Sequence, residues 1–450
     1  MPRHVANAIE SEPVAVTGEA HPPSPAHAES HLREQGRRPS FRLLVLSSDT
    51  FPPRRVDVSV LFGVELASRG HTIDWILQSE AECARAYVTS WGGGRVWVAA
   101  CDRGTSLLRR LRKHLLGIQQ DVALFSLLRS GPYDAVEVKD KFLSGVLALI
   151  AARWYRKRFI FWLSYPFAEF YLSSAREGTT PYPLLYRIRG ASFAFLLYRV
   201  LLPSADHVFV QSEQMRRDVA ARGISLAKLT AVPMGIRVDD FALPDSGGRV
   251  KLPAGERCFL YLGALGRERR IDFLLRVLQQ VRSREPSVKL YLVGEAERPA
   301  DREFLVEEAG RLQVLDGVVF VGQLPQAEAL RYAREADVCV SPIYPTPMLN
   351  PASPTKLVEY MALGKAVVAN THPEQRLLIE QSGCGYCVPW EESAFAEAIL
   401  TLLAQPELAR AMGERGRRYA LEHRAYGRIA DVVERELLRI AGIGRPEGRH

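Results

Sequence analysis

Short apolar runs alternate with longer amphipathic stretches along most of the chain. The runs at 42–48 (RLLVLSS) and 72–78 (TIDWILQ) have the pattern of buried strands, and residues 59–70 between them predict a helix. Further strands are predicted in this half at 95–100, 134–138, 159–164 and 207–212. Because helical stretches separate most of these strands, we expect an α/β fold with a parallel sheet covered on both faces.

The pattern breaks at residues 233–256, which are rich in Pro, Gly and Asp and predict a linker. Alternation then restarts, with strands predicted at 258–263, 288–294, 318–322, 337–341 and 366–370. The last predicted helices, at 393–405 and 428–442, follow these strands. The chain therefore predicts two doubly wound α/β domains of similar size. Ligands of such sheets bind beyond the carboxyl ends of the strands, so two facing domains imply a central cleft.

Residues 1–40 contain scattered prolines and no apolar periodicity, which predicts a disordered segment. They have no apolar run of the kind found in secretory signals, and their glutamates argue against a transit peptide. No uncharged apolar run in the chain reaches the roughly 18 residues that a membrane span requires. We therefore expect a cytoplasmic protein that is either freely soluble or peripheral at the inner face of the membrane.

The charge composition favours an anionic partner. The 450-residue chain is 47% hydrophobic and 24% charged, as in globular proteins, but its net charge is +8. Such basicity suits nucleic acid, a phosphorylated metabolite or an acidic membrane surface. Six cysteines are too few for a disulfide scaffold and favour a reducing compartment. Cys384 and Cys387 form a C-x-x-C pair without a second pair for zinc, so we predict neither a metal nor a cofactor.

A basic, aromatic region lies in the first predicted domain, at 107–117, 153–162 and 186–202. One interpretation is a set of solvated arginine faces on core helices. The other is an interfacial surface that docks on anionic lipid. No nucleic-acid-binding motif accompanies the charge, so we expect no nucleic-acid partner.

The stretch at 353–370 (SPTKLVEYMALGKAVVAN) predicts a helix followed by a strand. Ser353 is expected to be the N-cap, Pro354 the first helical residue and Gly364 the C-terminal stop. At helical spacing one apolar face is formed by Leu357, Val358, Met361 and Ala362.

Lys356 stands in the first turn of this helix, where the dipole disfavours a positive charge by a few tenths of a kcal/mol. A bound diphosphate would reverse that sign, because free backbone N–H groups and the ammonium would converge on one anion. Glu359, one turn later, could accept hydrogen bonds from two ribose hydroxyls. The alternative is a solvated lysine and a glutamate on a rim.

From about residue 41 to 440 the sequence resembles the family 4 glycosyltransferases, which have the GT-B fold. The resemblance is carried, in order, by ELASRGH (65–71), VPMGIRVDDF (232–241), YLGALGRERRIDFLL (261–275), LYLVGE (290–295), FVGQLP (320–325), ADVCVSP (336–342), the 353–370 stretch and RAMGERGRRYA (410–420). It implies retaining transfer of a sugar from a nucleotide diphosphate donor without a metal. It further implies an acceptor-binding Rossmann-like domain at 41–235, a donor-binding one at 236–425, and a C-terminal helix and tail at 426–450, with the helix able to pack on the first domain.

The resemblance also implies a set of donor-binding residues. Glu359 matches the glutamate that holds the donor ribose, and Lys356 lies where the helix start meets the diphosphate. Arg269 stands where the family has a phosphate-binding lysine, and as an arginine it can grip phosphate bidentately. Lys356 and Arg269 are therefore predicted to be catalytic. The predicted donor-binding residues are Glu359, Thr355, Ser353, Leu357, Arg267, Gly235, Leu324 and Asn350. For Leu324 a place in the core is the alternative to contact with the base.

Two departures from the family pattern affect this site. Ala264 replaces an arginine, and Arg267 or Arg270 could take its place, or the arginine cluster could be a solvated loop. Pro351 replaces the first of two glutamates spaced eight residues apart, so contacts to the sugar would come from 349–353, through backbone or Asn350.

The acceptor side also departs from the family. The loop at 49–59 lacks a glycine pair and carries Arg55 and Asp57, where Asp57 either positions the acceptor, as a catalytic residue, or caps a helix. Ser164 or Tyr165 stands where the family often has a histidine. Asp140, after a predicted strand, either faces the acceptor or caps the next helix. The predicted acceptor-binding residues are Arg55, Ser164, Tyr165 and Asp140.

These observations predict a retaining glycosyltransferase that moves a hexose-type sugar from a nucleotide diphosphate sugar to an acceptor. The acceptor is expected to be a glycan or a lipid-linked molecule in exopolysaccharide or cell-surface glycan assembly, and an anionic membrane surface is an expected partner. The alternatives are a catalytically silent sugar-nucleotide-binding scaffold and a nucleotide-sugar epimerase on the same fold.

Overall fold

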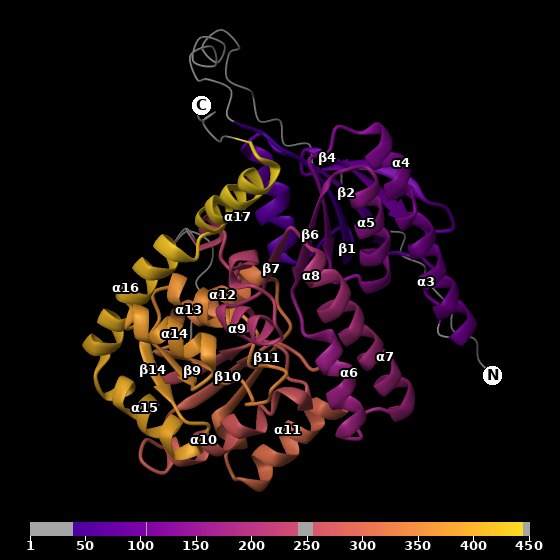
Figure 1. The fold of residues 1–450 in the computed structure, drawn as a ribbon. Helices are drawn as coiled ribbons and strands as arrows, with labels where there is room; N and C mark the ends of the chain where they lie inside the picture. The colour runs from indigo at the N-terminus through magenta and orange to yellow at the C-terminus, as the bar shows by residue number, and fades with distance from the viewer. Residues whose placement is uncertain (1–38, 105, 242–254, 444–450) are drawn as a thin grey trace, which may run out of the picture. The chain divides into compact units, whose positions relative to one another are not determined.

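The computed structural model describes residues 39–104, 106–241 and 255–443, which contain two sheets flanked by helices (Figure 1). The segment predicted to be disordered lies outside these residues, apart from residues 39 and 40. Residues 242–254 of the predicted linker also lie outside them. The described residues from Ser40 onward form one compact unit.

The first sheet has eight strands in the order β3-β4-β2-β1-β5-β6-β7-β8. All neighbouring strands are parallel except β3 and β4. The strands are β1 (Arg42–Phe51), β2 (Thr72–Ser79), β3 (Tyr87–Trp91), β4 (Gly94–Ala99), β5 (Ala135–Lys139), β6 (Arg158–Leu163), β7 (His207–Val210) and β8 (Leu229–Ala231).

The second sheet has six parallel strands in the order β11-β10-β9-β12-β13-β14. They are β9 (Cys258–Leu262), β10 (Lys289–Val293), β11 (Val318–Gly322), β12 (Val338–Ser341), β13 (Val367–Asn370) and β14 (Gly385–Val388). Two doubly wound, mainly parallel sheets are the α/β fold that the alternating pattern predicts, and that expectation is confirmed.

Helices connect most of the parallel strands. In the first half they are α2 (Val56–Ser59), the π-helix η1 (Leu61–Leu66), α3 (Leu107–Asp121), α4 (Ala123–Ser130), α5 (Phe142–Trp154), α6 (Phe167–Arg176), α7 (Pro183–Phe195), the π-helix η2 (Leu196–Leu201), α8 (Leu202–Ser204) and α9 (Glu213–Ala221). In the second half they are the 3₁₀ turn η5 (Arg267–Arg269), α10 (Asp272–Arg282), α11 (Pro299–Arg311), α12 (Gln326–Glu335), α13 (Thr355–Ala362), α14 (Pro373–Ser382), α15 (Glu392–Ala404), α16 (Pro406–His423) and α17 (Tyr426–Ala441).

Three strands were not predicted from the sequence pattern because they are short or exposed. β8 has only three residues, and the four residues of β14 are all only partly buried, so neither strand forms a buried apolar run. β3 is an antiparallel edge strand whose side chains are mostly exposed, and it reaches β4 through a turn at Gly92 and Gly93, both with positive φ. The helix predicted at 59–70 begins three residues earlier, at Val56, and continues as a π-helix.

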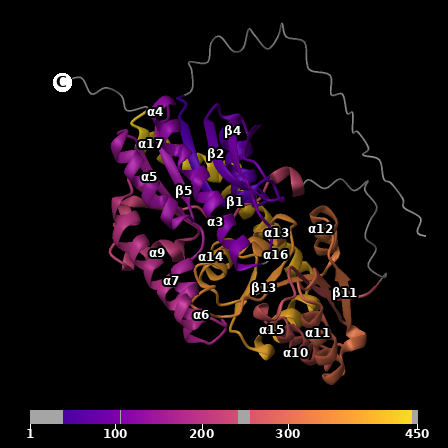
Figure 2. The same ribbon diagram turned by 90° about the vertical axis from the view of Figure 1, so that its right-hand side faces the viewer.

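The last helix, α17, belongs to the hydrophobic core on one face of the first sheet. Its residues Tyr426, Ile429, Val433 and Leu437 pack in one buried cluster with β1 and η1. Arg69 binds Glu434 of this helix at 2.6 Å. Figure 1 and Figure 2 both show α17, in yellow, beside the indigo strands of the first sheet.

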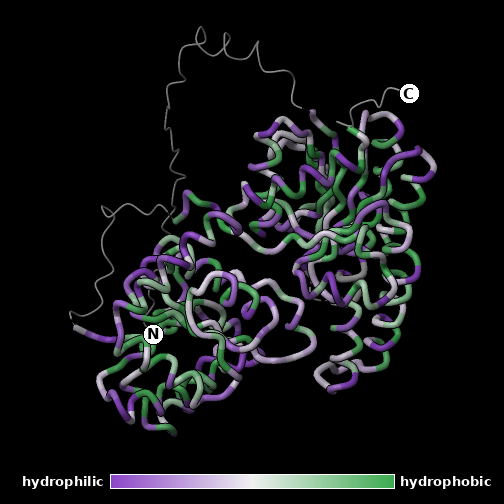
Figure 3. Tube along the Cα trace, turned by 60° about the vertical axis from the view of Figure 1, so that its left-hand side comes forward, coloured by the Kyte–Doolittle hydropathy of each residue, from purple (hydrophilic) through white to green (hydrophobic). Residues whose placement is uncertain are grey.

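Hydrophobic residues, in green, gather in the interior of both halves of the described chain, and hydrophilic residues, in purple, are more frequent toward the outside (Figure 3). Within the described residues, no helix has the length and apolar character that crossing a membrane requires.

Candidate active site

A cavity of about 250 Å³ lies beyond β9 and β12 in the second sheet. These neighbouring strands are the point from which the sheet extends in opposite directions, where doubly wound folds bind ligands. We call this space the cation cavity. Its lining residues are Tyr261, Arg269, Ser341, Pro342, Ile343, Tyr344, Leu349, Ala352, Ser353, Pro354, Thr355 and Lys356.

Lys356, in the first turn of α13, is half-buried at this cavity without a carboxylate partner among the described residues. Its Nζ lies 5.5 Å from the ring centroid of Tyr261. A Cβ atom on Gly263 would stand 2.0 Å from the lysine Cε, so a side chain at residue 263 would force this lysine side chain to move. Burial and the nearby Arg269 lower the pKa of Lys356 to about 8, although Glu359 opposes the shift. An uncompensated cation of this kind favours an anionic ligand.

The start of α13 adds backbone donors to the same place. Within the described chain the N–H groups of Lys356 and Leu357 have no hydrogen-bond partner, which is normal for first-turn amides that await a ligand or water. The side chain of Leu357 itself is fully buried in the core below. Leu357 can therefore take part in binding only through its backbone.

Of the three clustered arginines, only Arg269 lines the cation cavity. It is exposed and has no ion pair within the described residues. Arg267 instead turns toward α11, where its Nε lies 3.4 Å from Asp301 and its guanidinium covers the ring of Phe304. Arg270 stacks 5.2 Å from the ring centroid of Tyr344, at the edge of the cavity. The structure thus brings Arg269 and Lys356 together and leaves Arg267 apart.

Glu359 lies one turn after Thr355 and is half-buried beside α12. It accepts a hydrogen bond from Gln326 Nε2 at 3.2 Å. Burial raises the pKa of this carboxyl, although Lys356 works in the opposite direction. Leu324, two residues before Gln326, is partly buried against the core of the second sheet.

The prediction that Ser353 is the N-cap of this helix is wrong. The N-cap is Pro354, without a side-chain hydrogen bond, and the helix begins at Thr355. Ser353 Oγ instead accepts a hydrogen bond from the backbone N–H of Met234 at 2.9 Å, so it joins the helix start to the chain segment after β8. Asn350 is half-buried in the preceding loop and is not among the residues that line the cation cavity.

Gly235, which follows Met234, lies where the backbone of another segment leaves no room for a side chain. A Cβ atom there would stand 2.5 Å from the backbone oxygen of Arg424 and 2.5 Å from Ile429 Cδ1. The adjacent Ile236 exchanges backbone hydrogen bonds with Arg424 and Tyr426. The close approach at Gly235 is therefore to the segment that leads into α17.

The carboxyl edge of the first sheet holds a buried network of charged residues. Arg55 Nη2 lies 2.8 Å from Asp57 Oδ2, and Lys139 Nζ lies 3.4 Å from the same oxygen. Lys139, whose side chain is 1% exposed, also binds Asp49 at 2.8 Å. Although burial works to raise the pKa of Asp57, Lys139 and Arg55 hold it below its ordinary value. The network fixes the conformation of the 49–59 loop against β5.

Asp57 and Asp140 were each predicted either to cap a helix or to face the acceptor, and neither caps a helix. Asp57 lies inside α2, whose N-cap is Arg55, and it is held by the ion pairs above. Asp140 precedes Lys141, the N-cap of α5, and its carboxylate accepts hydrogen bonds from the backbone N–H of Ser164, at 2.9 Å, and from Ser164 Oγ. Burial raises the pKa of Asp140, although Lys139 and Ser164 oppose the shift.

A second cavity, of about 220 Å³, joins residues from both halves of the chain. We call it the junction cavity. It shares Ala352, Ser353 and Thr355 with the cation cavity, and its complete lining is Arg55, Ser164, Tyr165, Pro166, Gln211, Met215, Met234, Met348, Pro351, Ala352, Ser353 and Thr355. Three of the predicted acceptor-binding residues, Arg55, Ser164 and Tyr165, thus meet the start of α13. The two cavities are therefore neighbours, separated by the residues that they share.

Comparisons with known proteins agree with this geometry. The family described as "Glycosyl transferase 4-like domain" matches residues 61–235, and the family described as "Glycosyl transferases group 1" matches residues 256–405. The chain belongs to the family 4 glycosyltransferases, with the GT-B fold.

Curated relatives match this glycosyltransferase over part of its length. An alpha-monoglucosyldiacylglycerol synthase of Streptococcus pneumoniae is 26% identical over 221 residues, which are 47% of this chain and 48% of the relative. A phosphatidyl-myo-inositol mannosyltransferase of Mycolicibacterium smegmatis is 32% identical over 180 residues, 39% of this chain and 43% of the relative. The matches thus span about half the length of these relatives.

Solved structures show the same fold over most of the glycosyltransferase chain. A sucrose-phosphate synthase of Thermosynechococcus elongatus has a TM-score of 0.68 at 22% identity, covering 89% of this chain and 99% of its own. The Anabaena protein HepE, in complex with UDP and glucose, has a TM-score of 0.60 at 14% identity, covering 88% and 98%.

Several residues around the cavities of this glycosyltransferase were missing from the predicted site. Lys139 is the centre of the charged network, and its signal was a lysine at the end of β5, a strand whose residues are all buried. Gln211 accepts a hydrogen bond from Arg55 at 3.3 Å, and Ser212 Oγ donates to the backbone oxygen of Pro351 at 2.7 Å. These contacts join segments more than 100 residues apart, so sequence spacing gave no sign of them.

Proposed function

We propose that this glycosyltransferase transfers a hexose from a nucleoside diphosphate sugar to an acceptor hydroxyl, with retention of the anomeric configuration and without a metal. The observation that carries the proposal is the pair of cations, Lys356 and Arg269, which face one cavity at a helix start without a carboxylate partner in the described chain. A diphosphate supplies the missing negative charge. The solved relative that contains UDP and glucose is consistent with such a donor.

The proposed donor lies across the start of α13. Its diphosphate is held by Lys356, Arg269 and the free N–H groups of Lys356 and Leu357, and its ribose hydroxyls donate to Glu359. Arg267 is not needed in this arrangement, because Asp301 and Phe304 already hold it elsewhere. The sugar then points toward the junction cavity, where Pro351 takes the position of an acidic residue in related enzymes.

In the proposed step, the acceptor oxygen forms a bond to the anomeric carbon while the bond from that carbon to the phosphate oxygen breaks. The proton of the acceptor hydroxyl passes to the departing phosphate oxygen. The products are a glycoside and a nucleoside diphosphate. Lys356, Arg269 and the helix N–H groups stabilise the charge that develops on the leaving group, so the chain need not supply a nucleophile. Arg55, with Asp57 and Ser164, positions the acceptor.

We further propose that the acceptor is a lipid-linked molecule or a glycan of cell-surface assembly, reached at the cytoplasmic face of a membrane. The names of two relatives contain a diacylglycerol and a phosphatidyl-myo-inositol. Large apolar side chains stand exposed among arginines in the predicted basic region: Trp154 is 76% exposed, and Phe195 on α7 is 63% exposed. Such a surface suits peripheral attachment to anionic lipid.

A thermal-shift screen of nucleoside diphosphates and their sugars tests the donor site directly. A ligand present at about 100 times its Kd stabilises the folded state by about 2.7 kcal/mol. We expect one base to stabilise the protein more than the others, and its sugar conjugate to release nucleoside diphosphate slowly without an acceptor. If no nucleoside diphosphate raises the Tm, the proposed function is wrong.

The affinity for that nucleoside diphosphate is expected to fall as the pH rises from 7 to 9. The pKa of Lys356 is lowered to about 8 in the free protein, and only the protonated form attracts the anion. Binding raises the pKa, so the protein takes up protons on binding at pH 8.5. Calorimetry at pH 8.5 in two buffers with different ionisation enthalpies measures this uptake. Lys356→Gln should abolish it, and an equal uptake by that variant would show that another group titrates.

Glu359→Gln is expected to weaken nucleoside diphosphate binding about tenfold, because hydrogen bonds to a charged acceptor contribute roughly 1.5–3 kcal/mol. The parent protein should prefer the ribonucleotide over its 2′-deoxy analogue, and the variant should lose much of that preference. Equilibrium binding of both nucleotides measures the effect. Glu328→Gln on the exposed side of α12 is the matched control and should bind like the parent. Equal loss for both nucleotides would place the ribose elsewhere.

A further inference from the structure

The largest cavity that we describe, of about 570 Å³, has no part in the donor site above. It lies at the carboxyl edge of the first sheet, beyond β1, β2, β4 and β5, and its walls come from α3, α5, α6 and α7. We call it the first-sheet cavity. Asp140 on its edge binds Ser164, which lines the junction cavity. The Tyr165 ring of the junction cavity lies 4.9 Å from the ring of Phe167 in the first-sheet cavity. The two spaces are therefore neighbours.

Much of the wall of the first-sheet cavity is aromatic and aliphatic. Phe142 stacks on Phe193 with ring centroids 4.4 Å apart, and Tyr171 meets Phe193 at 5.6 Å. The remaining apolar lining residues include Leu77, Ile118, Leu143 and Phe167. Leu143 is 58% exposed although it faces the cavity, so apolar surface is left uncovered there. A wall of this kind suits an apolar ligand better than a free sugar.

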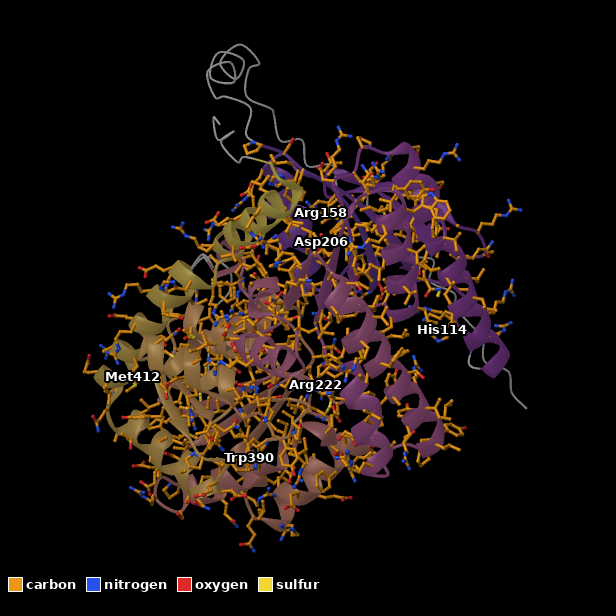
Figure 4. The ribbon with its side chains drawn as sticks, in the orientation of Figure 1. His114, Arg158, Asp206, Arg222, Trp390 and Met412 are labelled. Atoms are coloured by element: carbon orange, nitrogen blue, oxygen red, sulfur yellow. The ribbon has the colours of Figure 1, made fainter. Side chains whose placement is uncertain are left out.

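Two cations face the same cavity without a counter-ion among the described residues, Lys113 on α3 and Arg189 on α7. The Arg189 guanidinium lies 4.4 Å from the ring centroid of Tyr171, so the aromatic wall holds it in place. His114, labelled on α3 in Figure 4, lies close enough to both cations for them to lower its pKa, in addition to the effect of burial. Lys141, by contrast, is neutralised by Asp121 at 2.6 Å.

The apolar surface continues outside the cavity along α7. Leu185 and Ile188, near Arg189 on this helix, are 59% and 58% exposed. α7 packs on α6, and the two helices lie together in both ribbon views (Figure 1, Figure 2). A ligand whose charged group sits beside Arg189 could therefore extend an apolar chain over this surface.

We propose that the first-sheet cavity binds the acceptor, and that the acceptor is a phosphorylated lipid. Its phosphate lies between Arg189 and Lys113, its apolar chain follows the aromatic wall and the exposed face of α7, and its hydroxyl reaches the junction cavity past Asp140. This inference rests on the proposed function, because it names the acceptor of the same reaction.

Decyl phosphate, below its micelle concentration, is a suitable probe, with decanol and inorganic phosphate as its separate halves. We expect calorimetry to show that decyl phosphate binds at least about tenfold more tightly than either half. Arg189→Gln should weaken decyl phosphate about tenfold, since it removes a charge-assisted contact, and leave decanol unchanged. Arg187→Gln is the matched control, because this exposed arginine on the same helix does not line the cavity. The Tm and the nucleotide affinity of both variants verify their folding.

The inference is overturned if decyl phosphate binds no more tightly than decanol, or if the two arginine variants lose affinity equally. It is also overturned if vesicles with anionic lipid bind while decyl phosphate does not, since the exposed face would then be a membrane-docking surface alone. Lys356→Ala should leave decyl phosphate binding intact. Failure of nucleotide binding together with Arg189-dependent decyl phosphate binding would reject the proposed transfer but retain the lipid site.

Discussion

Replacing Lys356 with alanine is expected to lower kcat/KM for sugar transfer by about 100- to 1,000-fold. This is the effect typical of removing one preorganised hydrogen-bond donor from a developing negative charge. The side chain is fixed over Gly263 and the Tyr261 ring, and it has no carboxylate partner in the described chain. It therefore reaches the diphosphate with little reorganisation. The effect should fall mainly on kcat, because the leaving group carries more charge in the transition state than in the bound donor.

The assay follows release of nucleoside diphosphate from the nucleotide sugar that the thermal-shift screen identifies. Lys289→Ala is the control: this lysine stands at the start of β10, and within the described part of the chain its side chain hydrogen-bonds only to the backbone oxygen of Asp316. Gly263→Ala offers a second measurement, because its methyl group would displace the Lys356 side chain and should reproduce part of the loss. Wild-type kcat/KM in Lys356→Ala would refute the assignment of this residue.

The second large effect is expected on stability. Lys139→Ala should lower the free energy of unfolding by about 3–5 kcal/mol, because it removes the buried cation that Asp49 and Asp57 share and leaves them only the more exposed Arg55. Lys139 is 1% exposed and binds Asp49 at 2.8 Å and Asp57 at 3.4 Å. Urea denaturation monitored by fluorescence measures the loss. The control is Lys157→Ala, which should change stability by less than about 1 kcal/mol: this half-buried lysine lies at the opposite edge of the same sheet, before β6, and has no ion pair among the described residues.

The loss of stability in Lys139→Ala is also expected to depend on pH, because the network contains Asp57. The pKa of Asp57 is lower in the folded protein than in the unfolded chain, so its pairing stabilises the fold above the unfolded pKa and is lost as the pH falls through the folded value. The difference in stability between parent and Lys139→Ala should therefore shrink in acid. A difference that stays constant from neutral to acidic pH would mean that the lysine acts through packing alone.

The sequence predicts those parts of the fold that depend on neighbouring residues in the chain. Strands that are buried on both faces could be predicted from their apolar runs. They are β1, β2, β5, β6 and the core strands of the second sheet. The exposed hairpin strand β3 could not, since its alternation is weak. The apolar face of α13 was predicted correctly, and Leu357, Val358 and Met361 are all buried.

The features of the site that could not be predicted from the sequence arise from contacts between distant segments of the chain. Serine is favoured at helix N-caps, but the Ser353 hydroxyl instead accepts a hydrogen bond from the backbone N–H of Met234, 119 residues earlier in the chain. Gly235 was matched to a donor contact, while its space is taken by Arg424 and Ile429. Lys356 could be singled out locally, because a lysine in a first turn is unfavourable without an anion. The space that Gly263 leaves for its side chain could not be predicted, because that glycine follows β9, far earlier in the chain.

The position of α17 has a consequence for biosynthesis. One face of the first sheet is completed by Tyr426, Ile429, Val433 and Leu437, which follow all strands of the second sheet in chain order. The first sheet must therefore wait, with that face uncovered, until translation has passed the second sheet and reached α17. Nascent chains stalled before the codon for Tyr426 should consequently bind chaperones through the first half, whereas the second half can already be folded.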